Sequence, residues 1–211
     1  MGTRHLTCVV KGGDYKVAQY GQWDGYPSGQ GIEILNFLRD KLDRDRFFSS
    51  LDKTFEPTDE QIKSWWMEVG HDLDKSDGFV DSRIAKKYGE KHPSLSRDTG
   101  GRILEVIQNA REPVPVNLNK EFAADSLFCE YAYVVDFDKE TFEVFKGFNK
   151  EPLEEHERFA FIGLNPNRRS FKDGDSEYQY HQVRHIKTYD LNSLPADEEF
   201  LADLEPQDEE E

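Results

Sequence analysis

Apolar and polar positions alternate along two short segments near the start of the chain, His5–Val10 and Tyr15–Trp23. Both segments are rich in valine, tyrosine and threonine, and the dipeptide Gly12-Gly13 lies between them. Because glycine readily adopts positive φ, a Gly-Gly pair between two such segments predicts a β-hairpin with a tight turn.

The position of this turn sets an expected register. A turn centred on the two glycines pairs Cys8 with Val17 and Thr3 with Gln22, so the start of the chain lies beside the loop after the second strand. One face then carries Leu6, Cys8, Val10, Tyr15 and Val17, with Arg4, Gln19 and Trp23 at its end. The other face carries Thr3, His5, Thr7, Tyr20, Gln22 and Asp24.

Helical spacing follows this hairpin. Ile32, Leu35, Leu38 and Leu42 recur at the spacing of one helix face and predict an amphipathic helix. A second apolar stripe predicts a helix over Thr99–Ala110.

The segment at 44–97 is more charged, and we interpret it as a helical insertion. Thr58 and Gln61 have the spacing of a capping box, which predicts a helix through about Val69. Asp81 is expected to cap a second short helix that ends near Gly89.

The second half of the chain alternates with the period of strands. Leu127–Phe137 and Thr141–Phe148 flank a tight polar turn and predict a second hairpin. Phe159–Leu164 and Gln182–Leu191 predict two further strands. This order of hairpins and helices indicates an α+β fold, in which helices pack on an antiparallel sheet built from hairpins.

We expect one α+β domain over residues 1–195, followed by a short helix and an acidic tail over 196–211. The net charge of the chain is −16, and nine acidic residues lie between Asp197 and Glu211. A solvated helix end explains such a run, and an electrostatic contact with a basic partner is the alternative.

The acidic balance narrows the range of partners. A net charge of −16 repels phosphate backbones, so we expect no nucleic-acid partner. No apolar run is long enough to span a bilayer, so we expect no membrane partner.

The two cysteines, Cys8 and Cys129, make no disulfide framework, and the first residues lack a signal-peptide core, which favours a cytoplasmic protein. Common nucleotide-binding and zinc-protease motifs are absent, and we expect neither cofactor nor metal.

The densest group of chemistry-bearing residues lies in Ala18–Gly31, AQYGQWDGYPSGQG. Aromatic rings, amides and a carboxylate in a glycine-rich loop are typical of a ligand pocket, because glycine lets the backbone approach a bound group. The alternative is a structural loop in which Asp24 bonds nearby backbone N–H groups. The expected ligand-binding residues are Gln19, Tyr20, Gln22, Trp23 and Tyr26.

The expected register also suggests catalysis, because Thr3 and Arg4 lie beside this loop. If cleavage exposed Thr3, its α-amino group and hydroxyl would supply a base and a nucleophile. Thr3, Arg4 and Asp24 are therefore the candidate catalytic residues.

The opening MGTRHLTCVV and the segment WDGYPSGQG resemble a family of uncharacterised fungal, bacterial and phage proteins that begin MGTR and carry a similar W/S-D-x-Y-P-x-G-x-G segment. The likeness extends over CEYAYVVDFDKETFEVFKGF and DLNSLPADEEFLADL, and thus over most of the chain. More loosely, the start is similar to N-terminal-nucleophile (Ntn) hydrolases of the choloylglycine and penicillin-acylase type. That resemblance implies a layered fold and an aspartate matched by Asp24, whereas Gly2 and Gly21 depart from the expected nucleophile and arginine.

These observations favour a small-molecule-binding protein on a degenerate Ntn-hydrolase-like scaffold, with its pocket between the N-terminal strand and the QYGQWDGYPSGQG loop. An enzyme acting on an amide-containing or other small molecule at the same pocket is the first alternative. A protein-interaction domain is the second. The identity of the ligand and the oligomeric state stay open.

Overall fold

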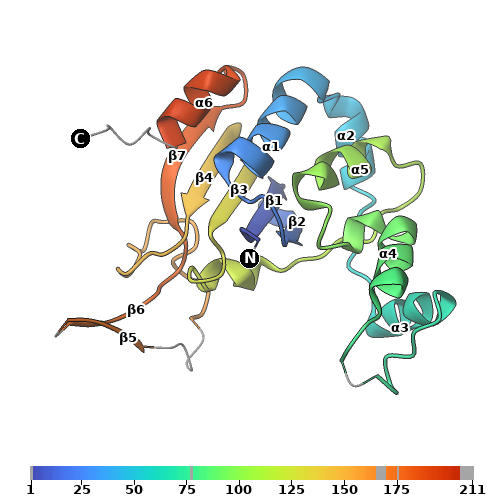
Figure 1. Ribbon diagram of the computed structural model, residues 1–211. Helices are drawn as coiled ribbons and strands as arrows, with labels where there is room; N and C mark the ends of the chain where they lie inside the picture. The colour runs from blue at the N-terminus through green and yellow to red at the C-terminus, as the bar shows by residue number, and fades with distance from the viewer. Residues whose placement is uncertain (1, 77, 165–169, 175, 205–211) are drawn as a thin grey trace.

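The computed structural model describes residues 2–76, 78–164, 170–174 and 176–204 (Figure 1). Its centre is a five-stranded sheet with the strand order β2-β1-β3-β4-β7. The strands are β1 (His5–Lys11), β2 (Asp14–Gly21), β3 (Tyr131–Asp136), β4 (Thr141–Lys146) and β7 (Arg184–Asp190).

The predicted α+β class is confirmed, but the sheet is mixed rather than antiparallel. The hairpins β1–β2 and β3–β4 lie side by side through their first strands, and β1 and β3 pair in parallel. The long helical segment between the hairpins returns the chain to the same end of the sheet, as a parallel pairing requires.

Helices cover one face of this sheet (Figure 1). The helix α1 (Ile32–Asn36) continues without a break into π-helical turns at Pro27–Gly31 and Phe37–Lys41, which confirms the predicted amphipathic helix. The others on this face are α2 (Arg44–Leu51), α5 (Ile103–Asn109) and α6 (Asp197–Leu204). The core on this face includes Val9, Val17, Ile34, Leu35, Phe47, Ile103, Tyr133, Val135, Phe142 and Phe200.

The opposite face is covered by loops and a 3-10 turn at Lys120–Ala124. Both cysteines lie in this second core and are free thiols. Burial raises the pKa of Cys8 to about 12, so this thiol is inert near neutral pH. The second core includes Leu6, Cys8, Val10, Ala18, Ala123, Cys129, Ala132, Val134, Phe145, Phe159 and Val183.

The helices α3 (Asp59–Glu68) and α4 (Ser82–Lys91) lie apart from the sheet (Figure 1). Both expected caps are present: Thr58 and Gln61 form the capping box, and Asp81 accepts the Arg83 N–H. The two helices meet through aromatic rings, because Trp66 stacks on Tyr88 with a centroid distance of 3.9 Å. Trp65 stacks on His92 at 4.5 Å. The expected insertion at 44–97 thus contains this aromatic unit, while its first helix, α2, belongs to the main core.

The expected register of the first hairpin is wrong beyond the first pairs. The turn lies at Gly12 and Gly13 as predicted, with φ of +67° and +79°. Val10 pairs with Tyr15, in the expected register, but the register shifts between Val9 and Val10. A β-bulge at this point slides the rest of β2 by one residue, which exchanges its two faces. Val17 therefore lies in the helix-covered core, and Tyr20 lies opposite Leu6.

The strand prediction also fails at Phe159–Leu164, which forms turns. The Gln182 side-chain amide donates to the carbonyls of Ala160 and Ile162, so a side chain bonds this backbone where a strand would have a ladder. Two short strands were missed, β5 (Ser170–Asp173) and β6 (Ser176–Gln179), which form a separate ribbon. The 3-10 turns at Pro93–Leu95 and Gly100–Arg102 precede α5 within the predicted helical region. Within the described ranges, no helix is long and apolar enough to cross a membrane.

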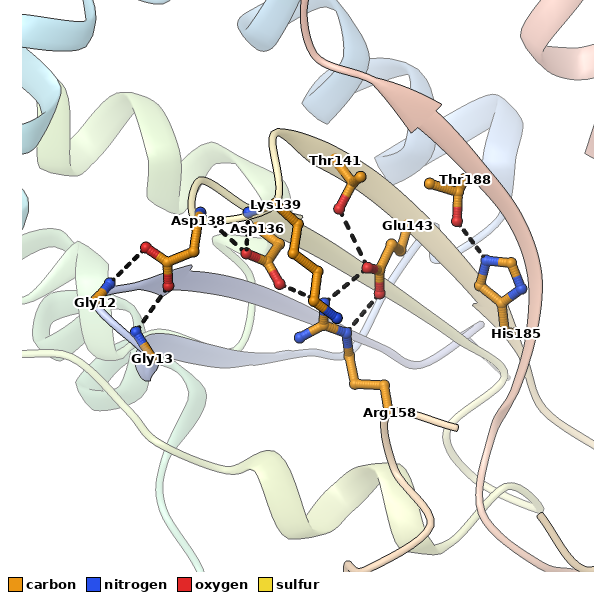
Figure 2. A network of polar contacts seen from close by, with 10 residues as sticks. All are labelled: Gly12, Gly13, Asp136, Asp138, Lys139, Thr141, Glu143, Arg158, His185 and Thr188. Carbon is orange, nitrogen blue, oxygen red and sulfur yellow. Dashed lines mark hydrogen bonds and ion pairs between the residues drawn. The ribbon is translucent and has the colours of Figure 1, made fainter. Parts of the chain in front are cut away.

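A largely buried arginine, Arg158, joins the loop at residues 153–162 to the sheet (Figure 2). The Arg158 guanidinium donates to both Asp136 of β3 and Glu143 of β4, with Nη2 2.7 Å from Glu143 Oε1. Asp136 Oδ1 also accepts the backbone N–H groups of Asp138 and Lys139. Burial by itself lowers the pKa of Arg158, but these two carboxylates raise it above its usual value.

The network continues to the first hairpin, because the Asp138 carboxylate accepts the N–H groups of Gly12 and Gly13 at 2.8 and 2.7 Å. Thr141 donates to Glu143 at 3.2 Å. Since these groups bond one another, we interpret the network as structural.

Replacing Arg158 tests this interpretation. In Arg158→Met, two buried carboxylates lose their shared counter-charge, and we expect the free energy of unfolding to fall by about 3–5 kcal/mol. Arg184→Met is the matched control, because Arg184 pairs with a Glu151 side chain that is 75% exposed. Its cost is expected to stay below about 1 kcal/mol. Urea unfolding measures both, and equal costs for the two variants would contradict a structural clamp.

Candidate functional site

The shifted register places His5 in an unusual environment. His5 lies opposite Gly21 and is 1% exposed. Among the described residues, neither ring nitrogen has a hydrogen-bond partner. Burial lowers the pKa of His5 to about 4, and a contact with the Thr3 backbone, outside the distance or angle of an ordinary hydrogen bond, raises it to a smaller extent. The imidazole is therefore neutral near pH 7 and presents one donor and one acceptor.

Two glycines make room for this ring. A Cβ atom at Gly21 would lie 2.1 Å from His5 Cε1, and one at Gly100 would lie 3.0 Å from His5 Nε2. Gly100 also has a φ of +53°, which favours glycine. The departure at Gly21 from the Ntn pattern thus has a local steric reason, since any side chain there would occupy the space of the imidazole.

His5 lines a pocket of about 420 Å³. Its neighbour Gly100 is buried as well, whereas Trp23, Asp24 and Arg97 are exposed. The pocket therefore has a buried floor at His5 and a charged, open rim. The remaining lining residues are Gln30, Glu33, Asp98 and Arg102.

Hydrogen bonds connect the rim. The Trp23 indole N–H donates to Asp98 Oδ1 at 3.0 Å. Arg102 donates to the Asp98 carbonyl at 2.9 Å, and its Nε lies 3.9 Å from Glu33 Oε1. Burial raises the pKa of Glu33, and Arg102 opposes this shift. The rim residues thus support one another across three segments of the chain.

The loop before α1 shapes the other side of the pocket. Asp24 has a positive φ of 56°, and its carbonyl accepts the Gln30 N–H at 2.9 Å. Gln30 Oε1 in turn accepts the N–H of Gly101 at 2.6 Å. These bonds join the loop at residues 24–30 to the turn at Gly100–Arg102.

Of the residues predicted from the sequence, Trp23 and Asp24 line this pocket. Thr3 is buried and does not line it, and its carbonyl accepts the Gly25 N–H. Gln19 is fully buried and donates to the Ser96 carbonyl at 2.8 Å. Tyr26 is half exposed beside Tyr131. The structure does not bring Thr3 and Asp24 together in one pocket.

Arg4, Tyr20 and Gln22 form a separate group. The Arg4 guanidinium lies over the Phe128 ring at 4.7 Å. The Tyr20 hydroxyl donates to Gln22 Oε1 at 2.6 Å, and its ring packs edge-on against Phe122. Tyr20 borders a different hollow of about 340 Å³. The bulge in the first hairpin separates this group from His5, because Tyr20 shares its face with Leu6 rather than with His5.

Sequence reasoning missed His5 as a site residue and missed the segment at 97–102. A histidine at the start of a largely apolar strand was a usable signal. The segment RDTGGR combines charges with a glycine pair, but only the fold brings it beside β1.

In the described part of the chain, no three His, Cys, Asp or Glu side chains are grouped so as to hold a metal ion. No family model, curated protein or solved structure matches this chain. The function is therefore inferred from the pocket itself.

The low pKa of His5 predicts a specific dependence of stability on acid. Above the unfolded pKa of 6.5, neither state protonates His5. As pH falls from 6.5 to about 4, the unfolded state binds a proton that the folded state excludes, so stability falls by roughly 3 kcal/mol in total. His5→Asn removes this titrating group, so the free energy of unfolding is expected to fall less steeply between pH 6.5 and 4.

Urea unfolding across this pH range measures the effect. His156→Asn, at an exposed position, is the matched control and should keep the wild-type slope. An identical slope in His5→Asn would show that His5 is not held neutral by the fold.

Proposed function

We propose that this chain binds a small polar molecule in the pocket whose floor is His5. The observation that carries this proposal is a fully buried imidazole that lines a pocket of about 420 Å³ and has no hydrogen-bond partner for either nitrogen among the described residues. Native proteins rarely leave buried polar atoms without a partner, and each such atom costs about 1–3 kcal/mol. A ligand that hydrogen-bonds His5 would recover part of this cost.

The size of the pocket fits this role. Sites for small molecules typically enclose about 300–1,000 Å³, and this pocket lies in that range. Its lining is mainly charged and polar, unlike the mostly apolar lining of such sites, which favours a polar ligand. Here the Trp23 ring supplies the aromatic part, and its N–H bond to Asp98 holds the ring at the rim.

Binding is favoured over acid-base catalysis at this site. A general base works best when its pKa lies near the working pH, and burial lowers that of His5 to about 4. Thr3, the candidate nucleophile, does not line the pocket, and its activation by cleavage stays a prediction. The same holds for an Ntn-like layering of the scaffold and for a cytoplasmic location.

A library of small polar fragments tests the proposal, with amides, alcohols, carboxylic acids, amines and amino acids as probes. Binding is read from the backbone amide resonances of Gly100 and Gly101 in the isotope-labelled protein. We expect at least one chemical class to shift both resonances. His5→Asn should weaken that binding about five- to thirty-fold, the effect of one hydrogen bond to a buried group.

Tyr20→Phe is the matched control, because it removes a hydroxyl on the opposite face of the sheet and should leave fragment affinity unchanged. Far-UV circular dichroism confirms that each variant is folded. Fragments that never perturb Gly100 and Gly101, or that bind a folded His5→Asn variant equally well, would overturn the proposal.

A further inference from the structure

The lining of the His5 pocket carries charges of both signs. Arg97 and Arg102 bring two guanidinium groups. Three carboxylates oppose them, those of Asp24, Glu33 and Asp98. His5, neutral near pH 7, lies at the floor between these charges.

Some of these charged side chains already pair with one another or with the backbone of the pocket wall. Arg102 lies 3.9 Å from Glu33 and donates to the Asp98 backbone, and the Asp98 carboxylate accepts the Trp23 N–H. Asp24 and Arg97 are the remaining charged groups of the lining, and both are exposed at the rim. Asp24 and Arg97 are therefore the charged rim side chains that lie outside these contacts.

The half-buried Glu33 adds a preference for positive charge to the pocket lining. Burial disfavours its carboxylate, and Arg102, at 3.9 Å, compensates only in part. A cationic group bound beside Glu33 would complete this compensation.

A ligand with a single charge cannot pair with both kinds of charged group in this pocket. A simple anion is attracted by Arg97 but repelled by three carboxylates. A simple cation is attracted by the carboxylates but does not pair with the Arg97 guanidinium. Only a molecule with both charges pairs both kinds of group.

We propose that the ligand is a small zwitterion of the amino-acid type. Its ammonium group contacts Asp24 and Glu33, its carboxylate contacts Arg97, and one of its polar groups hydrogen-bonds His5. This inference rests on the proposed binding function and specifies the chemical class of the ligand.

Four probes of similar size separate the charge classes: β-alanine, propanoate, propylammonium and propanamide. Titrations follow the backbone N–H resonances of Gly100 and Gly101 and the indole N–H resonance of Trp23. We expect β-alanine to bind at least about tenfold more tightly than each of the other three, since it alone makes charge-assisted bonds at both ends.

Two conservative variants test which residue contacts the ammonium group of the ligand and which contacts its carboxylate. Asp24→Asn keeps a residue that tolerates positive φ and removes one charge, so it should weaken β-alanine several-fold but not propanoate. Arg97→Gln should weaken both β-alanine and propanoate. Arg111→Gln, at an exposed position outside the lining, is the matched control and should change none of these affinities.

The inference is overturned if propanamide or a singly charged probe binds as tightly as β-alanine, if β-alanine does not bind, or if neither variant weakens it. Other fragments that bind Gly100 and Gly101 in a His5-dependent way would then leave the binding function standing. If no fragment of the library binds there, the binding function falls as well.

Discussion

One extra residue in the second strand determines what surrounds His5. Val9 pairs with Val17 and Val10 pairs with Tyr15, so Lys16 has no residue opposite it. Side chains alternate with a period of two along a strand, and a slip of one residue therefore exchanges the faces of everything beyond it. The slip places Gly21 instead of Tyr20 opposite His5. Because a Cβ atom at position 21 would lie 2.1 Å from the imidazole, the ring fits only in this register.

The two faces of the sheet show contrasting ways to bury polar groups. On the loop-covered face, Arg158 is joined to Asp136 and Glu143, and each carboxylate accepts further bonds. On the helix-covered face, His5 is buried more deeply than Arg158 but has no partner for either nitrogen among the described residues. A satisfied network stabilises the fold, whereas the unsatisfied His5 beside a pocket supports the proposal that a ligand binds there.

Local signals in the sequence predicted much of this fold. The Gly12-Gly13 turn, the amphipathic helix around α1, the capping box at Thr58 and the cap at Asp81 all depend on neighbouring residues, and all are present. The parallel pairing of β1 with β3 depends on residues more than a hundred positions apart, and nothing local specifies it. The apolar residues of Phe159–Leu164 led to a strand prediction, but they belong to a loop that packs on the second core.

The candidate site was predicted only in part for the same reason. Trp23 and Asp24 belong to a visibly dense loop, and both line the pocket. Arg97 and Gly100 line the pocket from a segment far away in the sequence. The β-bulge that sets the register at His5 leaves no mark in the pattern of apolar and polar residues, so the sequence did not predict it. A single unpaired position in β2 was enough to place Tyr20 opposite Leu6 and Gly21 opposite His5.

The fold holds His5 neutral at the floor of the pocket, with no hydrogen-bond partner for its ring among the described residues. The most direct measurement is a pH titration of the imidazole nitrogens by ¹H–¹⁵N NMR in the ligand-free protein. The account predicts that the His5 ring keeps the nitrogen shifts of a neutral imidazole until the pH approaches about 4. Protonation of His5 near the ordinary value of 6.5 in the folded protein would contradict it.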